Sequence, residues 1–503
     1  MHLIRTLLAF IRFALPKSYL ILISNVFQKL GRYFIRAASF LTIPKFHELI
    51  VPGKLVSLES ITIAAVIPVH NPKEAWFREL IESLKGNMFE EIIFLYSGAN
   101  VEYLKALAIS CLPNSINLKL ENFPGITDKT NVGLKSAKSD YVVLIDHDDV
   151  ILPQASEILK FAIKKNNFPD ILITDHKVIP EKSVGTNILR NFETYKPLAL
   201  DLSWFSQTNY WVHAVAMKTE FLSMNGFMDP DFEYAQDYEL WLRMLNCGAK
   251  VEYSPIMIYG WRTHAQSVAS GSLAKPEIAL RAAKAIENYF DVKNIETKVN
   301  EVILNGSSTG VYRANPKNMI LTTSRKVLSL KCITGMTHAA RESIMKIVPN
   351  GWTLIYPDCF DITKIHISPS SVVHVRGTDL KAAIIGIPVC NRDSKIVVMS
   401  ELDSQNNVIT YETNEVGPYS KFRVVRRIES LATPVFMIRT ELVETVLNSV
   451  EFENCYTLGH EISDVMKKRG HSIYLDGQSW VVSQNSWIEN HDSFEARNLF
   501  KAM

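Results

Sequence analysis

The stretch YVVLIDHDD, from Tyr141 to Asp149, decides the fold. It begins with an uninterrupted apolar run, which is typical of a strand buried on both faces inside a mostly parallel sheet. Three carboxylates and a histidine follow at once, at the strand end where such sheets bind ligands. Asp146 and Asp148 offer hard oxygen ligands that suit Mg²⁺ or Mn²⁺ carrying phosphates, although most short Asp clusters are simply solvated turns.

Strand and helix patterns alternate before this stretch. ITIAAVIPVHNP at 61–72 has the pattern of a second buried strand that ends in a Pro-punctuated turn. The apolar residues between Lys73 and Lys85 recur at helical spacing. This alternation predicts an α/β domain with a mostly parallel sheet. The other expected elements are a strand at Glu91–Tyr96, a helix at Val101–Ser110, a strand at Asn117–Leu120 and a helix at Asn131–Ala137.

Six segments, taken in order, carry a resemblance to a known family. They are IPVHNP at 67–72, NVGLKSAKSDYVVLIDHDDVILPQA at 131–155, PDILITDHKV at 169–178, YKPLALDLSWFSQTNYW at 195–211, GFMDPDFEYAQDYELWLRM at 226–244 and YGWRTHAQSVA at 259–269. Together they resemble the family 2 glycosyltransferases, which have the Rossmann-like GT-A fold and use nucleotide-sugar donors. The later segments look most like bacterial rhamnosyltransferase-like enzymes that build surface polysaccharides.

The resemblance implies a donor site and a metal site. A cation at the departing phosphate stabilises the charge that develops during transfer. Asp148 is the expected metal ligand, with Asp146 near the donor ribose or the metal and His264 completing the site, although a surface-loop histidine is the bland alternative. An imidazole ligand suits Mn²⁺ somewhat better than Mg²⁺. The residues expected to bind the nucleotide sugar are Pro68, His70, Asn71, Ser97, Asn131, Asp146, His147 and Asp148.

An inverting transferase also needs a general base for the acceptor hydroxyl. The resemblance assigns this role to Asp237, at the start of a predicted amphipathic helix, where helix capping is the alternative role. Gln236 stands where the family often carries a first carboxylate. The residues expected on the acceptor side are Asp175, Tyr210, Trp211, Gln236, Trp261 and Arg262.

Two segments depart from the family pattern. At Tyr96-Ser97-Gly98-Ala99 the family usually carries two carboxylates that recognise the base and ribose, and both are missing here. Either Ser97 and backbone groups hold the nucleotide, or the site binds it weakly. Thr174-Asp175-His176-Lys177 is an altered version of an acidic segment near the acceptor, and could equally be an ordinary turn at a strand end.

The remainder of the chain predicts a degenerate internal repeat. GWTLIYPDCF at 351–360 echoes 141–150, TPVFMIRTELVETV at 433–446 echoes 209–224, and LGHEISDVMKKRGHSIYL at 458–475 echoes 235–253. Aligning Gly470 with Gly248 sets Gly459 opposite Asp237, so the echo lacks the catalytic carboxylate. We therefore expect a GT-A domain at 55–295 and a degenerate GT-A-like domain at 310–503 without activity of its own. A second, metal-independent active site is the alternative.

Residues 1–54 differ from the rest in charge. They contain eight Lys or Arg and one acid, so the local charge is 8 − 1 = +7, against +2 for the whole chain. Apolar and basic residues occupy opposite helical faces there, and no apolar run reaches the roughly 20 residues of a spanning helix. This favours amphipathic helices on an anionic membrane surface, on the cytoplasmic side, over a helical hairpin packed on the catalytic domain.

Composition narrows the remaining choices. The near-balanced charge argues against a nucleic-acid partner. The six cysteines form no CxxC pair, which favours reduced thiols in the cytoplasm over disulfides or structural zinc. The expected function is a metal-dependent, inverting transfer of a hexosyl or deoxyhexosyl unit to a glycan or lipid-linked oligosaccharide. The alternative is an inactive pseudo-glycosyltransferase that binds glycan or scaffolds polysaccharide assembly; nucleotidyl transfer would need a phosphate-gripping loop that the sequence lacks.

Overall fold

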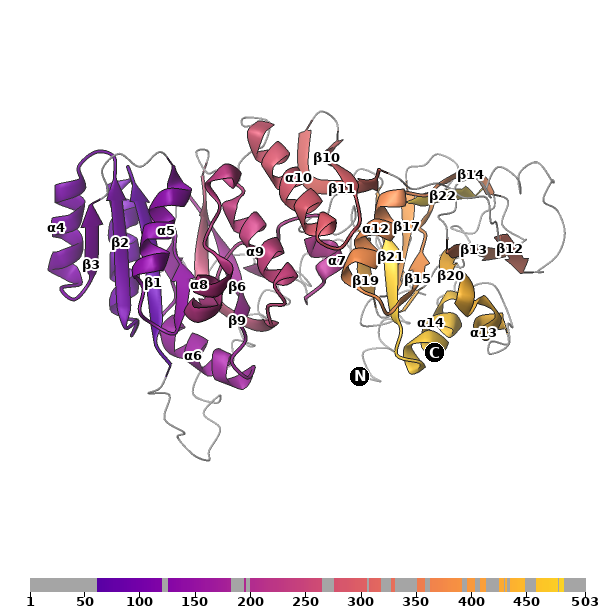
Figure 1. Cartoon of the computed structure of the whole chain (residues 1–503), viewed down its shortest axis with the longest axis horizontal. Helices are drawn as coiled ribbons and strands as arrows, with labels where there is room; N and C mark the ends of the chain where they lie inside the picture. Colours follow the sequence, from indigo (N-terminus) through magenta and orange to yellow (C-terminus); the bar gives the residue numbers. More distant parts are fainter. Residues whose placement is uncertain are drawn as a thin grey trace, which may run out of the picture. The chain divides into compact units, whose positions relative to one another are not determined.

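The structure is a computed structural model (Figure 1). It describes residues 61–119, 125–181, 194–195, 200–264, 276–304, 307–317, 327–330, 351–357, 362–390, 396–402, 408–412, 425–428, 430–431, 435–447, 458–477 and 479–483. The expected membrane-surface segment at 1–54 lies outside these residues. Within them, no helix combines the length and apolar character that crossing a bilayer requires. Cys111 and Cys247 are free thiols.

Strands and helices alternate in the first half, as the sequence predicts. The elements are β1 (Ile63–His70), α3 (Glu74–Lys85), β2 (Glu91–Ser97), α4 (Val101–Cys111), β3 (Ile116–Lys119), α5 (Ile126–Ser136), β4 (Tyr141–Leu144), β5 (Val150–Ile151), α6 (Ala155–Lys165), β6 (Ile171–Pro180), β7 (Thr194–Tyr195), α7 (Leu202–Phe205), β8 (Val215–Lys218), α8 (Thr219–Asn225), η4 (Pro230–Phe232), α9 (Gln236–Asn246), β9 (Val251–Thr263) and α10 (Pro276–Asp291).

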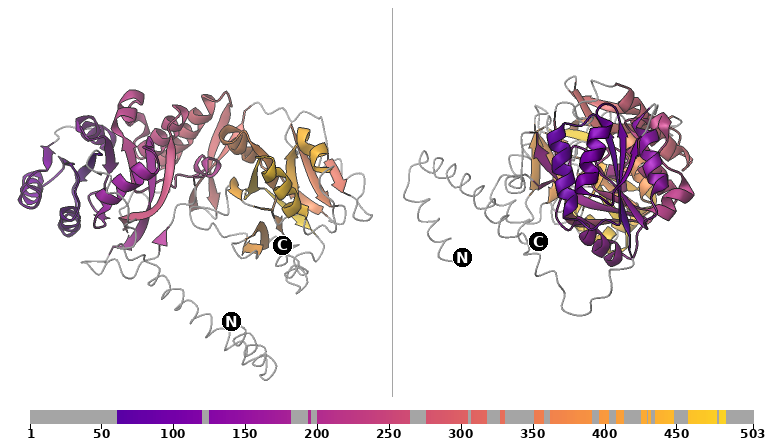
Figure 2. Two further views of the ribbon diagram at one scale, coloured as in Figure 1. Left: turned by 90° about the horizontal axis from the view of Figure 1, so that it is seen from below. Right: turned by 90° about the vertical axis from the view of Figure 1, so that its left-hand side faces the viewer.

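These strands form one nine-stranded sheet in the order β3-β2-β1-β4-β8-β6-β9-β5, with β7 beside β6. β1 is parallel to β2 and β4, and β6 is parallel to β9, whereas β8 is antiparallel to both of its neighbours. Helices cover both faces, with α3, α4 and α6 on one and α5, α9 and α10 on the other (Figure 2). Ile63 and Ala64 of β1 are buried in opposite cores, as expected for a doubly covered strand. The predicted fold class is therefore confirmed.

Helix α5 begins at Ile126, earlier than the predicted start at Asn131. Glu233, 107 positions further along the chain, accepts hydrogen bonds from the backbone N–H groups of Ile126 and Thr127 at 2.6 and 3.1 Å. The first N–H groups of a helix have no partner within the helix, and here a distant carboxylate supplies one. A local search for capping residues could not reveal this start.

The second half begins with a hairpin and continues with two further sheets. Their strand orders are β12-β13-β20-β15-β21-β19 and β14-β22-β16-β17-β18. The elements are β10 (Thr297–Leu304), β11 (Ser307–Pro316), β12 (Val327–Leu330), β13 (Trp352–Pro357), β14 (Ile362–His366), α12 (Pro369–Thr378), β15 (Ala382–Gly386), β16 (Val389–Cys390), β17 (Ile396–Leu402), β18 (Val408–Glu412), β19 (Val425–Ile428), β20 (Phe436–Arg439), η8 (Thr440–Leu442), α13 (Val443–Leu447), α14 (Leu458–Lys468), β21 (Ser472–Asp476) and β22 (Trp480–Ser483).

The six-stranded sheet repeats the topology of the first half. The set β12-β13-β20-β15-β21 matches β1-β4-β8-β6-β9, because in each the first and last pairs are parallel and the two between are antiparallel. Gly248 and Gly470, with φ of +80° and +82°, end the helix that precedes the last strand of each set. Positive φ at a helix end favours glycine, so both halves stop this helix in the same way. The expected internal repeat is therefore present in the strand topology.

Two equivalent hydrogen bonds, one next to the β4–β8 pair and one next to the β13–β20 pair, fix the register of the repeat. The Thr219 N–H donates to the Asp140 carbonyl at 2.9 Å, and the Thr440 N–H donates to the Gly351 carbonyl at the same distance. Gly351 therefore corresponds to Asp140, which corrects the sequence alignment of 351–360 with 141–150 by one residue. The aligned segments share an apolar pattern that fits either register, and only the pairing with β8 and β20 distinguishes them.

The corrected register has a chemical consequence. It sets Pro357, which has no side-chain oxygen, opposite Asp146. The pairing of β15 with β21 matches the pairing of β6 with β9 when Gly470 is aligned with Gly248. Gly459 then corresponds to Asp237, as the sequence alignment predicts.

Candidate active site

Asp149 anchors the acidic loop that follows β4. Its carboxylate accepts hydrogen bonds from the Tyr259 hydroxyl at 2.7 Å and the Arg262 backbone N–H at 2.6 Å. The Tyr259 hydroxyl in turn accepts a hydrogen bond from the Asp146 N–H at 3.0 Å. Asp149 is buried, and burial raises its pKa well above the ordinary value. Because both carboxylate oxygens have partners within the fold, Asp149 holds the loop to β9.

The Arg262 side chain lies behind the same loop. Its Nε donates to the Asp148 carbonyl at 2.7 Å, and its Nη2 donates to Oε2 of Glu79, on α3, at 2.6 Å. The side chain is fully buried and its guanidinium lies 5.4 Å from the centre of the Trp76 ring. The sequence-based expectation set Arg262 on the acceptor side. In the structure Arg262 instead supports the acidic loop. Its buried guanidinium needs a carboxylate partner, and Glu79 on α3 supplies one.

Asp148 and His264 lie side by side although they are far apart in the sequence. Nε2 of His264 is 2.7 Å from Oδ2 of Asp148, and the two side chains are 9% and 20% exposed, respectively. The His264 ring packs against Trp76 with ring centres 4.9 Å apart. Neighbouring ligands of one octahedral ion lie about 2.9 Å apart. In the structure these two atoms form a hydrogen bond, and they are also close enough to be ligands of one divalent cation.

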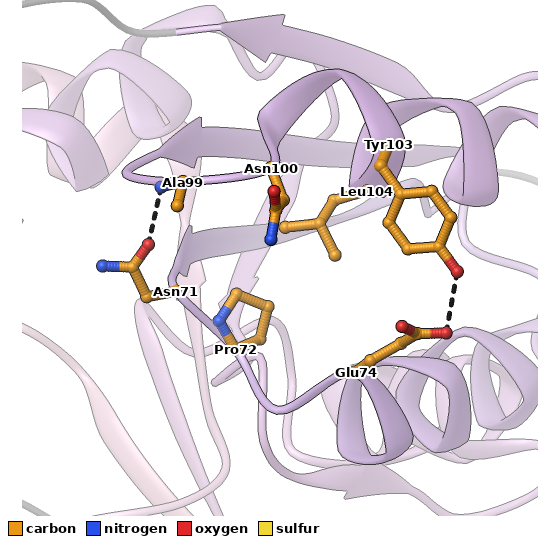
Figure 3. Close-up of a pocket in the computed structure, with 7 residues that line it drawn as sticks. All are labelled: Asn71, Pro72, Glu74, Ala99, Asn100, Tyr103 and Leu104. Carbon is orange, nitrogen blue, oxygen red and sulfur yellow. Dashed lines mark hydrogen bonds between the residues drawn. The ribbon is translucent and has the colours of Figure 1, made fainter.

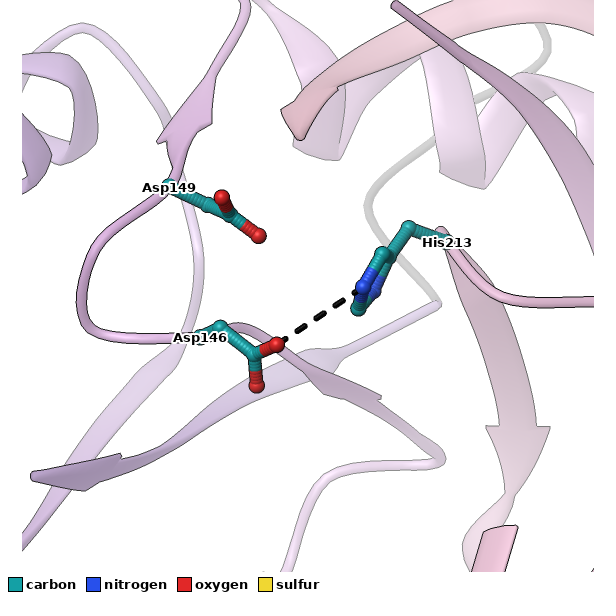
Figure 4. A group of neighbouring side chains, drawn as sticks. All are labelled: Asp146, Asp149 and His213. Atoms are coloured by element: carbon teal, nitrogen blue, oxygen red, sulfur yellow. Dashed lines mark ion pairs between the residues drawn. The ribbon is translucent and has the colours of Figure 1, made fainter. Parts of the chain in front are cut away.

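A second group of ligand atoms belongs to Asp146, Asp149 and His213, all within 4.8 Å of one another (Figure 4). His213 stacks on Tyr259 with ring centres 4.6 Å apart, and its Nε2 lies 3.6 Å from Oδ2 of Asp146. Burial lowers the pKa of His213 to about 4. The surrounding protein and the negative charge of Asp148 raise the pKa of Asp146. Sequence reasoning missed His213, because a histidine at the start of a buried strand carries no local signal of function.

Asp237 lies in the first turn of α9. Its Oδ2 accepts a hydrogen bond from Nδ2 of Asn209 at 3.0 Å, and its Oδ1 accepts one from the Tyr238 N–H at 2.7 Å. Burial raises the pKa of Asp237, and these two hydrogen bonds partly oppose that rise. The charge of Asp237 also contributes to the raised pKa of Asp146, so the two carboxylates share one electrostatic environment.

Three buried polar atoms have no hydrogen-bond partner among the described residues, and they belong to Asn209, which bonds Asp237, and to two residues expected on the acceptor side. They are Oδ1 of Asn209, Oε1 of Gln236 and Nε1 of Trp211. The Trp211 ring is fixed by stacking on Phe205, with ring centres 3.8 Å apart. Leaving a buried polar group unpaired costs about 1–3 kcal/mol. Two acceptors and one donor are therefore left unsatisfied within the described part of the chain.

The other residues expected on the acceptor side have partners within the protein. Oδ1 of Asp175 accepts a hydrogen bond from the Tyr253 hydroxyl at 2.8 Å. The Tyr210 hydroxyl bonds both the N–H and the carbonyl of Asp201, at 2.9 and 3.0 Å. Trp261 is partly exposed and its ring contacts His213, with ring centres 5.7 Å apart. Asp175 and Tyr210 therefore have structural contacts within the core.

The expected nucleotide-binding residues gather at the carboxyl ends of β1 and β2. Nδ1 of His70 lies 3.0 Å from the Ser97 hydroxyl, to which Nζ of Lys129, on α5, donates at 2.7 Å. Oδ1 of Asn71 accepts a hydrogen bond from the Ala99 N–H at 2.6 Å. Burial lowers the pKa of Lys129. Sequence reasoning missed Lys129, since one lysine on a helix has no distinguishing pattern.

Two expected nucleotide-binding residues have structural contacts instead. Nδ1 of His147 lies 3.1 Å from the Pro68 carbonyl, which ties the acidic loop to β1. The Asn131 side chain donates to the Met228 carbonyl at 2.8 Å and accepts from the Met228 N–H at 3.0 Å. Asn131 is buried, so both halves of its amide serve to hold the chain that leads into α9.

A pocket of about 330 Å³ opens beside this nucleotide-side cluster (Figure 3). Asn71 and Ala99 belong both to the cluster and to the pocket wall. On the opposite side, the Tyr103 hydroxyl donates to Oε1 of Glu74 at 2.7 Å. The lining residues are Asn71, Pro72, Glu74, Ala99, Asn100, Tyr103 and Leu104.

Comparison with known proteins gives a family match over part of the chain. Residues 64–218 match the family model described as glycosyl transferase family 2. An uncharacterised glycosyltransferase of Rickettsia prowazekii is 24% identical over 43% of this chain and 68% of its own length. The amylovoran biosynthesis glycosyltransferase AmsE of Erwinia amylovora is 29% identical over 33% of this chain and 62% of its own length.

These matches leave much of each protein uncovered. Across the curated relatives, the match spans between 25% and 68% of the relative's own length. Among solved structures, residues 1–349 of S. aureus TarS in complex with UDP-GlcNAc are 18% identical to this chain, with a TM-score of 0.34. That similarity covers 46% of this chain and 72% of the other.

Proposed function

We propose that the first half of the chain transfers a hexosyl or deoxyhexosyl unit from a nucleotide-sugar donor to a glycan. The starting point is the family 2 glycosyltransferase domain that the chain carries at residues 64–218. The observation that supports this proposal is that two contacting residue pairs share one electrostatic environment. Asp148 lies against His264 and Asp237 lies against Asn209, while the charges of Asp148 and Asp237 both act on Asp146. A metal-binding pair and a carboxylate base within one site are what glycosyl transfer requires.

Asp148 and His264 would hold a divalent cation, Mn²⁺ or Mg²⁺. When bound there, the cation supplies positive charge to the diphosphate that leaves the sugar. The chain supports this pair from behind: Arg262 bonds the Asp148 carbonyl, and Trp76 packs on the His264 ring. Both side chains are thereby held in place before a ligand arrives, which reduces the ordering cost of binding.

Asp237 is the proposed general base. Its carboxylate takes the proton of the acceptor hydroxyl as that oxygen attacks the anomeric carbon on the face opposite the leaving group, so the configuration inverts. Asn209 orients the carboxylate by donating to one of its oxygens. The unpaired polar atoms of Asn209, Gln236 and Trp211 would bind other hydroxyl groups of the acceptor.

The donor nucleotide is proposed to lie along the carboxyl ends of β1 and β2. Ser97, Lys129 and the backbone around Ala99 offer hydrogen-bond donors there, where the resembling family carries carboxylates. Asp146, next to the cation pair, would face the ribose. The neighbouring pocket of about 330 Å³ has room for part of the nucleotide.

The acceptor is proposed to be a growing, lipid-linked cell-surface glycan. Two observations support this: the name of the relative AmsE states amylovoran biosynthesis, and the basic residues 1–54 have the composition of a segment attracted to anionic lipid. The enzyme would then work at the cytoplasmic face of the membrane as a peripheral protein.

A transfer assay tests the proposed activity. Purified protein is incubated with Mn²⁺, a panel of nucleotide sugars and lipid-linked acceptors, and the product anomer is read by NMR. We expect an inverted product that Asp148→Ala and Asp237→Asn each abolish. A retained anomer would remove Asp237 from its role. A different result would favour the inactive scaffold. In that case neither wild type nor the variants would transfer sugar, and both substitutions would leave the cellular glycan phenotype unchanged.

A further inference from the structure

The second half keeps the fold of the first without its chemistry. Pro357 stands where the first half has Asp146, and Gly459 stands where it has Asp237. A sheet that has lost both carboxylates cannot repeat the proposed reaction at these positions. Its packing against the first half suggests a different use.

The contact between the halves centres on residues 201–211, here called the bridge segment. Oδ1 of Asp201 caps α7 by accepting from the Ser203 and Trp204 N–H groups, and its Oδ2 accepts from the Arg427 N–H of β19 at 2.6 Å. Ser206, at the other end of α7, lies 2.8 Å from Nδ1 of His374 on α12. The second half therefore holds both ends of α7.

His374 is enclosed by the β10–β11 hairpin of its own half and by α10 and Ser206 of the first half. Its Nε2 accepts a hydrogen bond from the Ala314 N–H of β11 at 3.3 Å, and its ring contacts Phe290 of α10 with ring centres 5.4 Å apart. Its side chain is fully buried. One turn along α12, a Cβ added to Gly377 would collide with the same Phe290 ring. This close packing fixes α12 against α10, β11 and the bridge segment.

The bridge segment also reaches the proposed base. Asn209 donates to Asp237, and the Tyr238 hydroxyl donates to the Phe205 carbonyl at 2.6 Å. The chain of contacts therefore runs from His374 through Ser206 along the bridge segment to Asn209 and Asp237. Each step is a hydrogen bond or a covalent connection within one short segment.

We infer that the second half is a positioning module: the His374–Ser206 contact holds the bridge segment, and through Asn209 it aligns the Asp237 carboxylate with the acceptor hydroxyl. His374 is a positioning residue, since it does not contact the Asp148–His264 or Asp237–Asn209 pair in the structure. The inference rests on the proposed transferase function. It assigns the degenerate repeat a role in acceptor chemistry while leaving donor binding to the first half alone.

Two substitutions of His374 separate its two contacts. In His374→Asn the side-chain amide takes the place of Nδ1, next to Ser206, whereas in His374→Gln the amide reaches the place of Nε2, next to Ala314. Ser206→Ala removes the contact between the Ser206 hydroxyl and Nδ1 of His374 by changing the residue on the bridge segment. Ser463→Ala is the matched control, because Ser463 is equally buried but donates to Gly459 and accepts from Leu431, both within the second half.

The full-length variants are compared in transfer rate, in the acceptor KM and in the dissociation constant of the donor nucleotide, at equal folded fraction. We expect His374→Gln and Ser206→Ala to lower kcat over acceptor KM by roughly tenfold, the effect of one misaligned hydrogen bond. His374→Asn and Ser463→Ala should stay within about twofold of wild type, and donor binding should be unchanged in all four. Hydrogen exchange of the amides in residues 201–211 should accelerate only in the first two variants.

The outcomes distinguish the inference from the proposed function. Inactivity of the wild type would contradict the proposed function, and with it the inference. The inference alone would be contradicted by the following result. The wild type is active, and His374→Gln and Ser206→Ala equal Ser463→Ala in transfer rate and in amide hydrogen exchange. Faster exchange without a loss of rate would show that the contact is merely structural, which also overturns the inference.

Discussion

Asn209 donates a hydrogen bond from Nδ2 to Oδ2 of Asp237 at 3.0 Å, while its own Oδ1 has no partner among the described residues. This hydrogen bond stabilises the charged form of Asp237, whose pKa burial raises. A base must be unprotonated to act, so activity is lost as pH falls through the pKa of Asp237. The acid limb of kcat/KM should therefore lie above the ordinary aspartate range.

Removing the Asn209 amide should move that limb further. In Asn209→Ala the hydrogen bond that lowers the Asp237 pKa is absent, so the acid limb shifts to higher pH. The pH dependence of kcat/KM measures the shift. Asn225→Ala is a suitable control, since Nδ2 of Asn225 bonds only the Phe221 carbonyl of its own helix. A limb at the same pH in Asn209→Ala and wild type would contradict the assignment of the base.

Glu79 and Arg262 form a buried ion pair that supports the acidic loop. Glu79→Gln removes the carboxylate charge that the guanidinium of Arg262 contacts at 2.6 Å. We expect the free energy of unfolding to fall by about 3 kcal/mol, the usual cost of breaking one side of a buried pair. Chemical denaturation monitored by fluorescence measures this loss.

Glu82→Gln on the same helix gives the comparison. Glu82 pairs with Lys85 at the surface with its side chain 64% exposed, so this substitution should change stability by less than about 1 kcal/mol. Equal stability of the two variants would mean that the buried pair contributes nothing beyond an exposed one. The account of Arg262 as a support of the loop would then lose its energetic basis.

His374 predicts a pH dependence of stability. Burial lowers its pKa from 6.5 to about 3, so the folded protein keeps it neutral while the unfolded chain takes up a proton below pH 6.5. The unfolded state binds more protons in this window, and stability therefore falls as pH decreases from about 6.5 toward 3. The contribution of this one group has a limiting slope of about 1.4 kcal/mol per pH unit.

The difference between wild type and His374→Asn isolates this contribution from the other titrating groups. We expect the stability of wild type relative to the variant to decrease steadily from pH 6.5 to pH 4.5, as measured by urea titration at each pH. Parallel curves for the two proteins would show that His374 is not kept neutral in the fold.

The sequence predicted most of the fold because its signals are local. The apolar run before Asp146 and the helical spacing after Lys73 fix a strand and a helix without knowledge of the partners. The start of α5 could not be predicted, because its capping carboxylate, Glu233, is contributed by a distant segment. The one-residue shift of the repeat around Gly351 likewise depends on pairing with another strand.

The residues of the candidate site that belong to sequence motifs could be predicted, and the others could not. The motif residues Asp148, His264 and Asp237 were all selected from sequence, and two of them lie side by side in the structure. His213 and Lys129 join the site through tertiary contacts that leave no local pattern. Arg262 was also predicted as a site residue, but the sequence could not show that its side chain points into the core. The buried carboxylate that pairs with it, Glu79, lies on a helix far away in the sequence.

The most direct test of the central claim is calorimetric titration of the full-length protein with a panel of nucleoside diphosphates, with and without Mn²⁺. We expect one nucleotide to bind only with the metal. Asp148→Ala should abolish this binding, and the exposed control Asp231→Ala should retain it. Absence of binding under every condition, or equal binding by wild type and Asp148→Ala, would contradict the assignment of a metal-dependent nucleotide-sugar site.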